Sequence, residues 1–477
     1  MYSKVFEILP FKPEILWTDG LVFLLFLGIL VFTWYTRHRE HLCAPWREVA
    51  KKPLGMAALT ILMFFIAVGL MDSLHFRPKL EQNGADTSER YAGEILSVLD
   101  VVLGPLRTQN EKTYSAPFAT HLYAKEQIER EDGSSFRDYP PLRYGGAHLS
   151  NNQSLVTDVR NRSISGAIAA FTLWLILFGF SALVIAKIRR ISWNTLLRHV
   201  LNNDDAISWR VVIITSGVIF LLIGVSFALA PYYHIFGTDK VGEDVFYQTL
   251  KSIRTGLVIG TLATLVMLPI AILLGIMAGY FRGWVDDVIQ YVYTTLNSIP
   301  GVLLIAATVL MMLVYMDTHP ELFQTLEERA DFRLLFLSII LGVTSWTGLC
   351  RLLRAETLKL REMEYVQAAH ALGEHNLIIL LRHILPNVMH IVLIMIVLDF
   401  SGLVLAEAVL SYLNIGVDPT MYSWGNMINS ARLEMSREPI VWWSLLAAFI
   451  FMFMLVLSAN LFSDAVRDAF DPRLRVR

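Results

Sequence analysis

The sequence predicts an all-α integral membrane protein, a polytopic helical bundle. Of its 477 residues, 55% are apolar and 17% charged, whereas soluble domains carry about 25% charged residues. A membrane-spanning helix needs about 20 predominantly apolar residues. Nine runs meet this requirement, at about 20–36, 54–72, 166–186, 211–230, 254–280, 288–315, 334–353, 387–412 and 442–462. Helices satisfy the backbone hydrogen bonds of such runs in lipid.

The remaining composition narrows the class further. A net charge of −2 gives no indication of a nucleic-acid partner. Cys43 lies in a basic loop and Cys350 inside a predicted span, which argues against a disulfide or a metal cluster. The first apolar run lacks a basic n-region and a small-residue cleavage site, so we expect a retained anchor and not a signal peptide.

The lysines and arginines predict the orientation of the spans. Short cytoplasmic loops are rich in these residues, and the loops at 37–53 and 187–210 carry them: Arg37, Arg39, Arg47, Lys51 and Lys52 in the first, and Lys187, Arg189, Arg190, Arg198 and Arg210 in the second. Alternation through nine spans then places 354–386 and the C-terminus in the cytoplasm, and the N-terminus outside. The segments at 73–165, 231–253, 316–333 and 411–441 also fall outside.

Residues 73–165 form the one sizeable polar insertion. Their length suits either a small external domain or a loose cap on the bundle. The stretch DTSE predicts a helix at about 87–103, in which Asp86 caps the start and Glu89 reaches back. Apolar residues follow at helical spacing, namely Ile95, Val98 and Val102.

The stretch YVQAAHALGEHNLIILLRHILPN, at 365–387, predicts a helix, a turn and a second helix. Apolar residues at i, i+3, i+4 and i+7 form one narrow stripe on the first helix, namely Tyr365, Ala368, Ala369 and Leu372. Gly373 would cost about 1 kcal/mol inside a helix and fits a left-handed stop better. The second helix covers about 376–384, and Pro386 suits the first turn of the next span.

Two interpretations of this hairpin stay open. It either merely joins two spans, or it is a docking element whose alanines let the surface of a partner approach closely. A metal site is not expected, because His370 and His375 lie on different faces of a helix and no cysteine or carboxylate pair converges with them.

Several short motifs resemble one family. QAA at 367–369, Gly373, and Leu385 with Pro386 resemble the cytoplasmic coupling loop of permease subunits in binding-protein-dependent ATP-binding-cassette importers, usually written EAA, then G, then I-x-LP. The flanking YVQAAHALG and RHILPN look like the dipeptide and oligopeptide branch, C-type subunit. Further matches are FGTDKVGEDVF at 236–246, GYFRGWVDD at 279–287, SIPGVLL at 298–304, EAVLSYLNIGV at 407–417, SWGNMI at 423–428 and VRDAFDPRLR at 466–475.

The resemblance covers about 205–477 and implies a six-helix type I importer core there. Before it come two extra spans in 1–72, the insertion at 73–165, and a third extra span with its linker in 166–204. It also implies that the loop at 354–386 contacts an ATPase through Tyr365, Gln367, Ala368, Ala369, Gly373, His383, Leu385 and Pro386. The chain departs from the family at Gln367, where Glu is usual, and at Glu243, where Arg is usual.

The same resemblance implies partners and location. The sequence contains no G-x-x-x-x-G-K-[ST] motif, so this chain is not expected to hold ATP. We expect no enzyme activity and no cofactor here, with ATP and Mg²⁺ bound by two separate ATPase subunits. A second homologous permease, a periplasmic or lipid-anchored binding protein and the lipid of a bacterial cytoplasmic membrane complete the expected assembly. The resemblance leaves the substrate open among dipeptides, oligopeptides, nickel chelates, sugars and peptide antibiotics.

Two carboxylates lie inside a predicted span. Ionisable residues within spans are functional candidates, and Asp399 and Glu407 are eight positions apart, near one face of the helix. They are candidates to line a pathway for the cationic amino terminus of a peptide. The alternative is a structural role, which for Glu407 means capping or pairing near the external end.

Two other functions compete with an importer subunit. A stand-alone channel or ion-coupled transporter predicts midplane charges or broken helices in two repeated halves, and the sequence shows no convincing repeat. A membrane-bound enzyme predicts a catalytic motif, but H-E-x-x-H and G-x-S-x-G are both absent.

Overall fold

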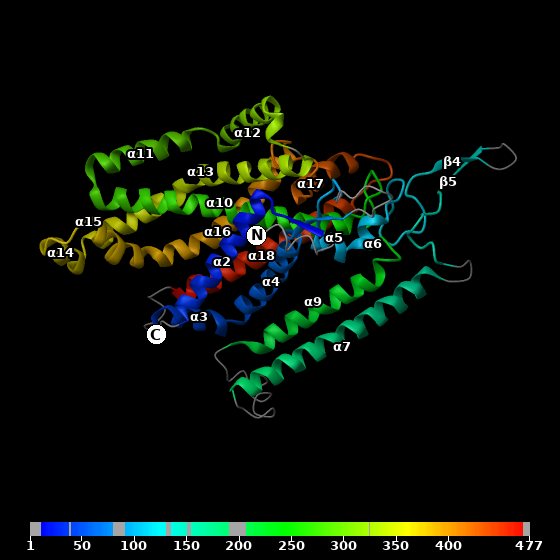
Figure 1. Cartoon of the computed structure of the whole chain (residues 1–477), viewed down its shortest axis with the longest axis horizontal. Coiled ribbons are helices and arrows are strands. Elements are labelled where there is room, and N and C mark those ends of the chain that lie inside the picture. The colour runs from blue at the N-terminus through cyan, green and yellow to red at the C-terminus, as the bar shows by residue number, and fades with distance from the viewer. Residues whose placement is uncertain are drawn as a thin grey trace, which may run out of the picture. The chain divides into compact units, whose positions relative to one another are not determined.

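The structure is a computed structural model that describes residues 11–37, 40–79, 91–129, 135–149, 154–189, 207–323 and 325–470. Over these residues, nine helices are long and apolar enough to cross a membrane, which confirms the predicted fold class (Figure 1). The chain divides into two compact units. Unit 1 comprises Met1–Ile15, Ala50–Arg254 and Tyr422–Ser458, and unit 2 comprises Leu16–Val49, Thr255–Met421 and Ala459–Arg477.

The membrane-spanning helices cover the predicted apolar runs. They are α2 (Trp17–Thr36), α4 (Pro53–Asp72), α7 (Leu155–Arg189), α9 (Trp209–Leu229), α10 (Val245–Phe281), α12 (Gly301–Thr318), α13 (Leu326–Arg361), α16 (Leu385–Tyr412) and α18 (Trp443–Phe470). Shorter helices are α3 (Glu40–Lys51), α5 (Val98–Val102), α6 (Gly104–Thr108), α11 (Gly283–Ser298), α14 (Glu364–Ala371), α15 (Asn376–Ile378) and α17 (Trp424–Glu434), with a 3₁₀ turn at Pro320–Leu322.

One predicted span is wrong. The run at 288–315 is two helices, α11 and α12, separated at Ile299 and Pro300. Ile299 is extended, with φ −88° and ψ 129°, because proline disfavours helical backbone in the residue before it and has no N–H to donate. With 16 residues α11 is about 24 Å long and carries a polar face. Only α12 is apolar enough to span.

In unit 2, α10 and α13 cross in very close contact. A Cβ added to Gly275 would lie 2.8 Å from the carbonyl oxygen of Cys350, and one added to Gly279 would lie 2.6 Å from Thr357 Cβ. The extra helix α2 is also tied to this unit. The buried carboxylate of Asp331, on α13, accepts a hydrogen bond from the backbone N–H of Thr18 at 3.0 Å and caps the start of α2.

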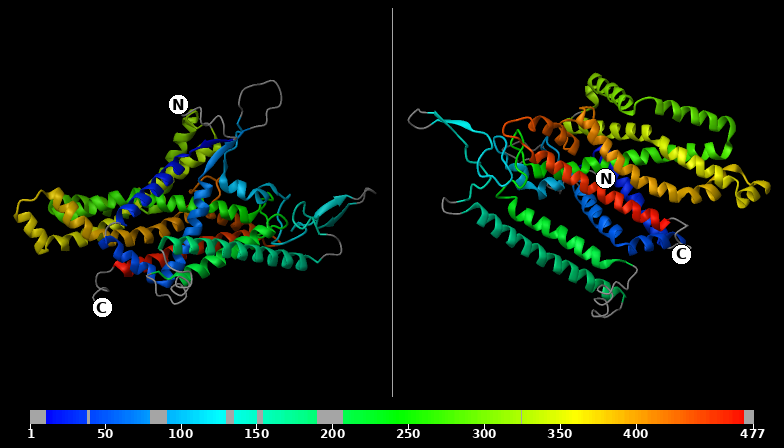
Figure 2. Two further views of the ribbon diagram at one scale, coloured as in Figure 1. Left: turned by 60° about the horizontal axis from the view of Figure 1, so that its bottom comes forward. Right: turned by 180° about the vertical axis from the view of Figure 1, so that it is seen from behind.

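In unit 1, α7 and α9 form an antiparallel pair whose helices lie side by side in every view (Figures 1 and 2). Glycines allow this approach, because a Cβ on Gly224 would collide with Ala170 and one on Gly166 would lie 2.6 Å from Ala228 Cβ. Helix α4 packs through Phe65, whose ring contacts Trp424 and Phe451 edge to face at 6.5 Å.

The insertion, defined here as residues 73–154, contains only short helices and strands over its described parts, 73–79, 91–129, 135–149 and 154. Strands β1 (Phe11–Glu14), β2 (His75–Pro78) and β3 (Leu96–Ser97) form an antiparallel sheet in that order, with Phe11 opposite Pro78 and His75 opposite Ser97. Strands β4 (Glu126–Glu129) and β5 (Ser135–Asp138) form a hairpin with Glu126 opposite Asp138.

Only the end of the predicted helix at about 87–103 is helical in its described part. Asp86 and Glu89 lie outside the described residues, while Ile95 precedes a strand and helix α5 begins only at Val98. Ser97 is the cap: its Oγ accepts from the N–H of Asp100 at 3.2 Å, and the carboxylate of Asp100 accepts from the N–H of Ser97 at 2.8 Å. This capping box ends the strand and starts the helix locally. Of the predicted apolar positions Ile95 is buried and Val102 is exposed, and the other buried residues here are Leu99, Leu103 and Leu106.

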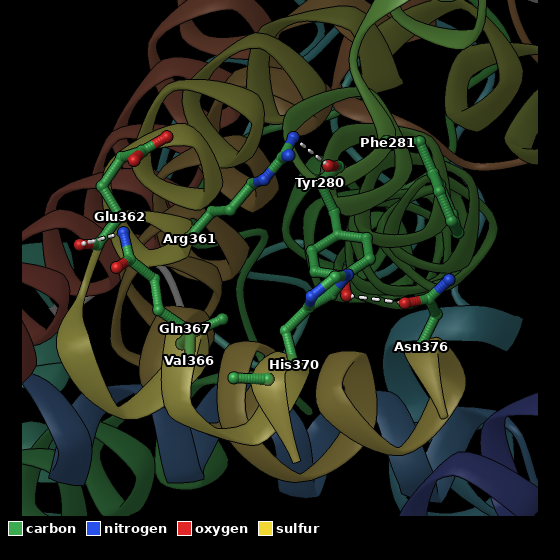
Figure 3. A pocket seen from close by; sticks show the side chains of 9 residues that line it. Tyr280, Phe281, Arg361, Glu362, Val366, Gln367, His370 and Asn376 are labelled. Atoms are coloured by element: carbon green, nitrogen blue, oxygen red, sulfur yellow. Dashed lines mark hydrogen bonds between the residues drawn. The ribbon is translucent and has the colours of Figure 1, made fainter. Parts of the chain in front are cut away.

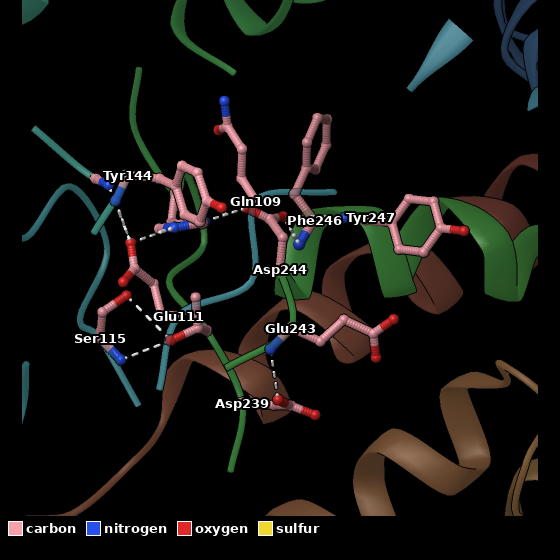
Figure 4. Close-up of polar contacts among 12 residues, drawn as sticks. Gln109, Glu111, Ser115, Tyr144, Asp239, Glu243, Asp244, Phe246 and Tyr247 are labelled. Carbon is pink, nitrogen blue, oxygen red and sulfur yellow. Dashed lines mark hydrogen bonds and ion pairs between the residues drawn. The ribbon is translucent and has the colours of Figure 1, made fainter. Parts of the chain in front are cut away.

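A buried polar cluster joins the insertion to the start of α10 (Figure 4). The carboxylate of Glu111 accepts from the N–H groups of Arg143, Tyr144 and Gly145 at 2.8, 2.8 and 3.1 Å. It also faces His234, whose Nδ1 lies 2.7 Å from Asp244. Asp244 caps α10, accepting from the N–H groups two and three residues later at 2.8 and 3.1 Å.

The contacts of this cluster shift the pKa of Glu111 and that of His234. Burial opposes the charged forms, but the hydrogen bond from His234 and three backbone N–H groups outweigh it and lower the pKa of Glu111 to about 2. Burial likewise disfavours charged His234, yet the hydrogen bonds and charges of Asp244 and Glu111 raise its pKa to about 9. The imidazolium between two carboxylates is therefore the stable arrangement near neutral pH.

Candidate functional site

The stretch singled out in the sequence forms a helix and a turn. Helix α14 ends at a Schellman motif, in which the N–H of Gly373 donates to the carbonyl of His370 at 3.0 Å and the N–H of Glu374 to that of Ala369 at 3.1 Å. Gly373 has φ +78°, in the left-handed region, which a glycine occupies without strain. The predicted left-handed stop at Gly373 is confirmed.

The apolar stripe predicted on α14 is mostly not its buried face. The buried residues are Val366 and Ala369, at 2% and 8% exposure. Tyr365, Ala368 and Leu372 are exposed, Leu372 at 87%. Val366 and Ala369 are three positions apart and belong to a single apolar cluster with α10, α13 and α16. The helix thus packs along a narrow line, and the rest of the predicted stripe faces away from the core.

The second helix of the hairpin runs straight into a span. His375 Nδ1 accepts from the N–H of Leu377 at 3.3 Å and starts α15. A π-helical segment, η2 (Ile379–Ile384), follows and continues without a break into α16. The predicted helix at 376–384 is confirmed, and Pro386 lies in the first turn of α16 as expected. Leu385 is half-buried and Pro386 exposed.

Polar contacts join the two arms of the hairpin. His383 Nε2 lies 3.1 Å from the carboxylate of Glu374. The side-chain amide of Asn387 donates to the hydroxyl of Tyr365 at 3.1 Å and to the carbonyl of His383 at 2.6 Å. Tyr365 and His383 are therefore brought together at the base of the hairpin, and both hold its shape.

A groove of about 340 Å³ opens beside α14 (Figure 3). Gln367 and His370 of α14 lie among its lining residues, as do Arg361, Tyr280 and Asn376. The amide of Gln367 donates to the backbone carbonyl of the residue five positions earlier at 3.2 Å, so this side chain is held at the rim.

The opposite wall of the groove is a part of the site that sequence reasoning missed. Arg361 donates to the carbonyl of Tyr280 at 2.7 Å, and the hydroxyl of Tyr280 donates to Asn376 Oδ1 at 2.8 Å. The motif GYFRGWVDD, which begins at 279, was visible in the sequence. Nothing in that motif, however, indicated that it contacts the hairpin some 80 residues later.

The two intramembrane carboxylates lie in different surroundings on α16. Glu407 is 2% exposed, and its Oε1 accepts from Ser411 Oγ at 2.7 Å. Asp399 is half-buried, and within the described part of the chain it has no hydrogen-bond or ion-pair partner. Asp399 is thus the less buried of the two carboxylates, whereas Glu407 lies inside the protein.

Known proteins resemble the second half of the chain. The family described as "Binding-protein-dependent transport system inner membrane component" matches residues 271–476. A glutathione transport system permease protein of Pectobacterium atrosepticum is 32% identical over 244 residues, which are 51% of this chain and 73% of that protein. A dipeptide transport system permease protein of Lactococcus lactis is 32% identical over 240 residues, 50% of this chain and 64% of that protein.

An oligopeptide transport system permease protein of Mycobacterium tuberculosis is 31% identical over 242 residues, 51% of this chain and 77% of that protein. These matches agree with the nine apolar helices and with the helix, turn and helix at 364–384. The chain therefore belongs to the family of binding-protein-dependent transport system inner membrane components, as a multi-pass permease subunit.

Proposed function

We propose that this chain pairs with a second, homologous permease subunit to form the translocation pathway of an ATP-driven importer of peptides or similar small solutes. A periplasmic or lipid-anchored binding protein delivers the substrate. The observation that carries this proposal is the agreement of the relatives, whose names state glutathione, dipeptide and oligopeptide transport. Glutathione is itself a small peptide, so the names share one substrate class.

The segment at 354–386, called the coupling segment from here on, is the proposed contact for a separate ATPase subunit. It exposes several large apolar side chains close together in sequence, namely Tyr365, Leu372, Leu377 and Leu381. Exposed apolar groups gathered at one place favour a protein partner. ATP and Mg²⁺ bind to two such ATPase subunits, and the coupling segment and the C-terminus then face the cytoplasm.

The continuity of the second arm supports a lever mechanism. Residues 376–412 form one unbroken helical path through α15, η2 and α16. When ATP draws the two ATPase subunits together, the push on α14 passes along this path into the span that carries Asp399. Packed helices switch between discrete arrangements, so the spans rock between inward and outward openings.

Asp399 is the proposed pathway residue. A carboxylate without a partner in a span is costly, and the ammonium group of a peptide amino terminus would neutralise it. We expect Asp399→Asn to lower uptake of peptides with a free amino terminus about tenfold, with little effect on N-acetylated peptides. Uptake of labelled peptides into vesicles measures this, and a wild-type rate for both substrates would remove Asp399 from the pathway.

The function itself is tested by reconstitution. The chain, its second permease, the ATPase subunits and the binding protein are placed in liposomes, and uptake of labelled dipeptides and oligopeptides is followed. We expect uptake that requires both ATP and the binding protein and stops with a hydrolysis-deficient ATPase. Uptake without ATP would favour the alternative, a stand-alone channel or ion-coupled transporter. Mass spectrometry of ligands retained by the binding protein identifies the substrate.

A further inference from the structure

The turn at 279–287 makes polar contacts with both arms of the coupling segment. The strongest is a two-point ion pair between helices α11 and α13: Arg354 Nε lies 2.6 Å from Asp286 Oδ1, and Arg354 Nη2 lies 2.7 Å from Asp286 Oδ2. Two parallel charged hydrogen bonds fix both distance and orientation. The hydrogen bonds from Arg354, against a smaller opposing effect of burial, lower the pKa of Asp286, so it is charged at neutral pH.

Further contacts continue along the same two helices. The guanidinium of Arg351 lies 6.0 Å from the ring centre of Tyr293. The hydroxyl of Thr347 donates to Asn297 Oδ1 at 3.1 Å. The three contacts follow each other in antiparallel order along α11 and α13. Helix α11 is thus held to α13 over its whole length.

The turn between α10 and α11 packs tightly against α13. Arg282 and Gly283 both have φ +56°, which reverses the chain sharply between α10 and α11. Just before it, a Cβ on Gly279 would meet Thr357 Cβ at 2.6 Å and the carbonyl oxygen of Arg354 at 2.8 Å. A displacement of α13 near Arg354 therefore moves the turn and α11 together. The first break in regular helix after α11 is at Ile299 and Pro300.

We propose that Asp286 and Arg354 are a positioning pair that passes the displacement of the coupling segment to α11 and, across the break at Pro300, to α12. The motion thus reaches α12 as well as α16. This inference rests on the proposed function, because it assumes an ATPase that pushes on the coupling segment. It adds to α16 a second route by which the motion reaches the spans, and this route starts from the first arm of the coupling segment.

The test is a charge swap in the reconstituted importer. The single variants Asp286→Arg and Arg354→Asp and the double variant Asp286→Arg/Arg354→Asp are compared with wild type for ATPase co-purification, ATP hydrolysis and uptake. We expect each single variant to keep the ATPase bound and to lower the number of substrates imported per ATP hydrolysed about tenfold. The double variant should restore at least about a third of the wild-type ratio. Arg354→Lys, which keeps the charge but loses the two-point geometry, should give an intermediate ratio.

The control is another arginine–aspartate pair, whose arginine also lies on α13 and whose aspartate lies on α12. Arg329 of α13 pairs with Asp317, and both side chains are exposed, at 41% and 66%. Arg329→Asp should leave the import ratio unchanged, because exposed pairs contribute little. Single variants with a wild-type ratio would overturn the proposal, as would a folded double variant without any recovery. If the single variants do not fold, a wild-type ratio for Arg354→Lys overturns it. Failure of the proposed function can be distinguished from failure of this inference, because the wild-type importer would then show no ATP-dependent uptake.

Discussion

Two regions of the molecule use polar residues in opposite ways. One is the junction, where the insertion meets the start of α10, and the other is the coupling segment. At the junction, Glu111, His234 and Asp244 are buried and bond to each other and to backbone N–H groups. In the coupling segment, the polar contacts only shape the hairpin, while Leu372 and other apolar side chains stay exposed beside an open groove. The first region stabilises this chain by itself. The second is held in shape by its own contacts and keeps apolar side chains exposed, as the proposed ATPase contact requires.

The largest expected effect comes from removing the central cation of the junction. His234→Phe leaves two buried carboxylates without their shared partner, and breaking such a buried pair costs about 3–5 kcal/mol. We expect a marked fall in the thermal stability of the purified protein, followed by loss of monomer on size exclusion. The control is His148→Phe, because His148 is partly exposed and its partner Asp158 also pairs with Arg162. Equal losses for both variants would contradict a special role of the junction.

The pH dependence of stability follows from His234 and Glu111 in this cluster. The pKa of His234 is raised from 6.5 to about 9, so its contribution is complete below about pH 6.5 and is lost as pH rises through about 9. The pKa of Glu111 is lowered from 4.5 to about 2, so its contribution is complete above about pH 4.5 and is lost as pH falls toward 2.

Wild type should therefore lose thermal stability steadily between about pH 7 and pH 9.5. His234→Phe should lack that decline, because its stability no longer depends on the imidazolium. Melting of both proteins across the pH range checks this. A parallel decline in the variant would assign the pH effect to other groups.

In the coupling segment, substitutions of Gly373 are expected to have an intermediate effect on stability. No atom lies within 4 Å of a Cβ added there, so a substitution acts through the φ of +78° and through the new surface. Gly373→Val forces a branched residue into the left-handed region, at about 1–2 kcal/mol, and should lower uptake strongly while the protein still inserts. Gly373→Asn tolerates this φ and should retain most uptake.

Gly373→Asp separates strain from surface charge. It tolerates the backbone as asparagine does but adds a negative charge next to the exposed helix end, so we expect it to abolish uptake with normal insertion. Vesicle uptake with matched protein levels measures all three variants. Normal transport by a well-expressed Gly373→Asp would contradict a coupling role for the turn.

Hydropathy alone predicted the fold class and most of the spans, because long apolar helices satisfy their own backbone hydrogen bonds within lipid. It failed at Pro300, where apolar residues continue across a helix break. The helix predicted from DTSE at about 87–103 failed for a local reason, because a capping box at Ser97 starts the helix only at Val98. Periodicity found α14 and its glycine stop but did not identify the buried face, which Val366 and Ala369 form. The wall of the groove, formed by Tyr280 and Arg361, depends on tertiary contacts that no local pattern encodes.

The smallest effect on stability is expected from a substitution of Leu372. This substitution also compares the two regions most directly. Its side chain is 87% exposed, so Leu372→Ser should change the free energy of unfolding by less than about 0.5 kcal/mol. The same variant should weaken co-purification of the ATPase, because an exposed apolar side chain is lost from the proposed contact. Leu106→Ser is the matched control in the insertion, where Leu106 is 3% exposed and its loss should cost about 2–5 kcal/mol without weakening ATPase binding in the protein that remains folded. We therefore expect Leu106 to matter only for stability and Leu372 only for association with the ATPase. A Leu372→Ser variant that is unstable but still binds the ATPase would contradict this assignment of the two regions.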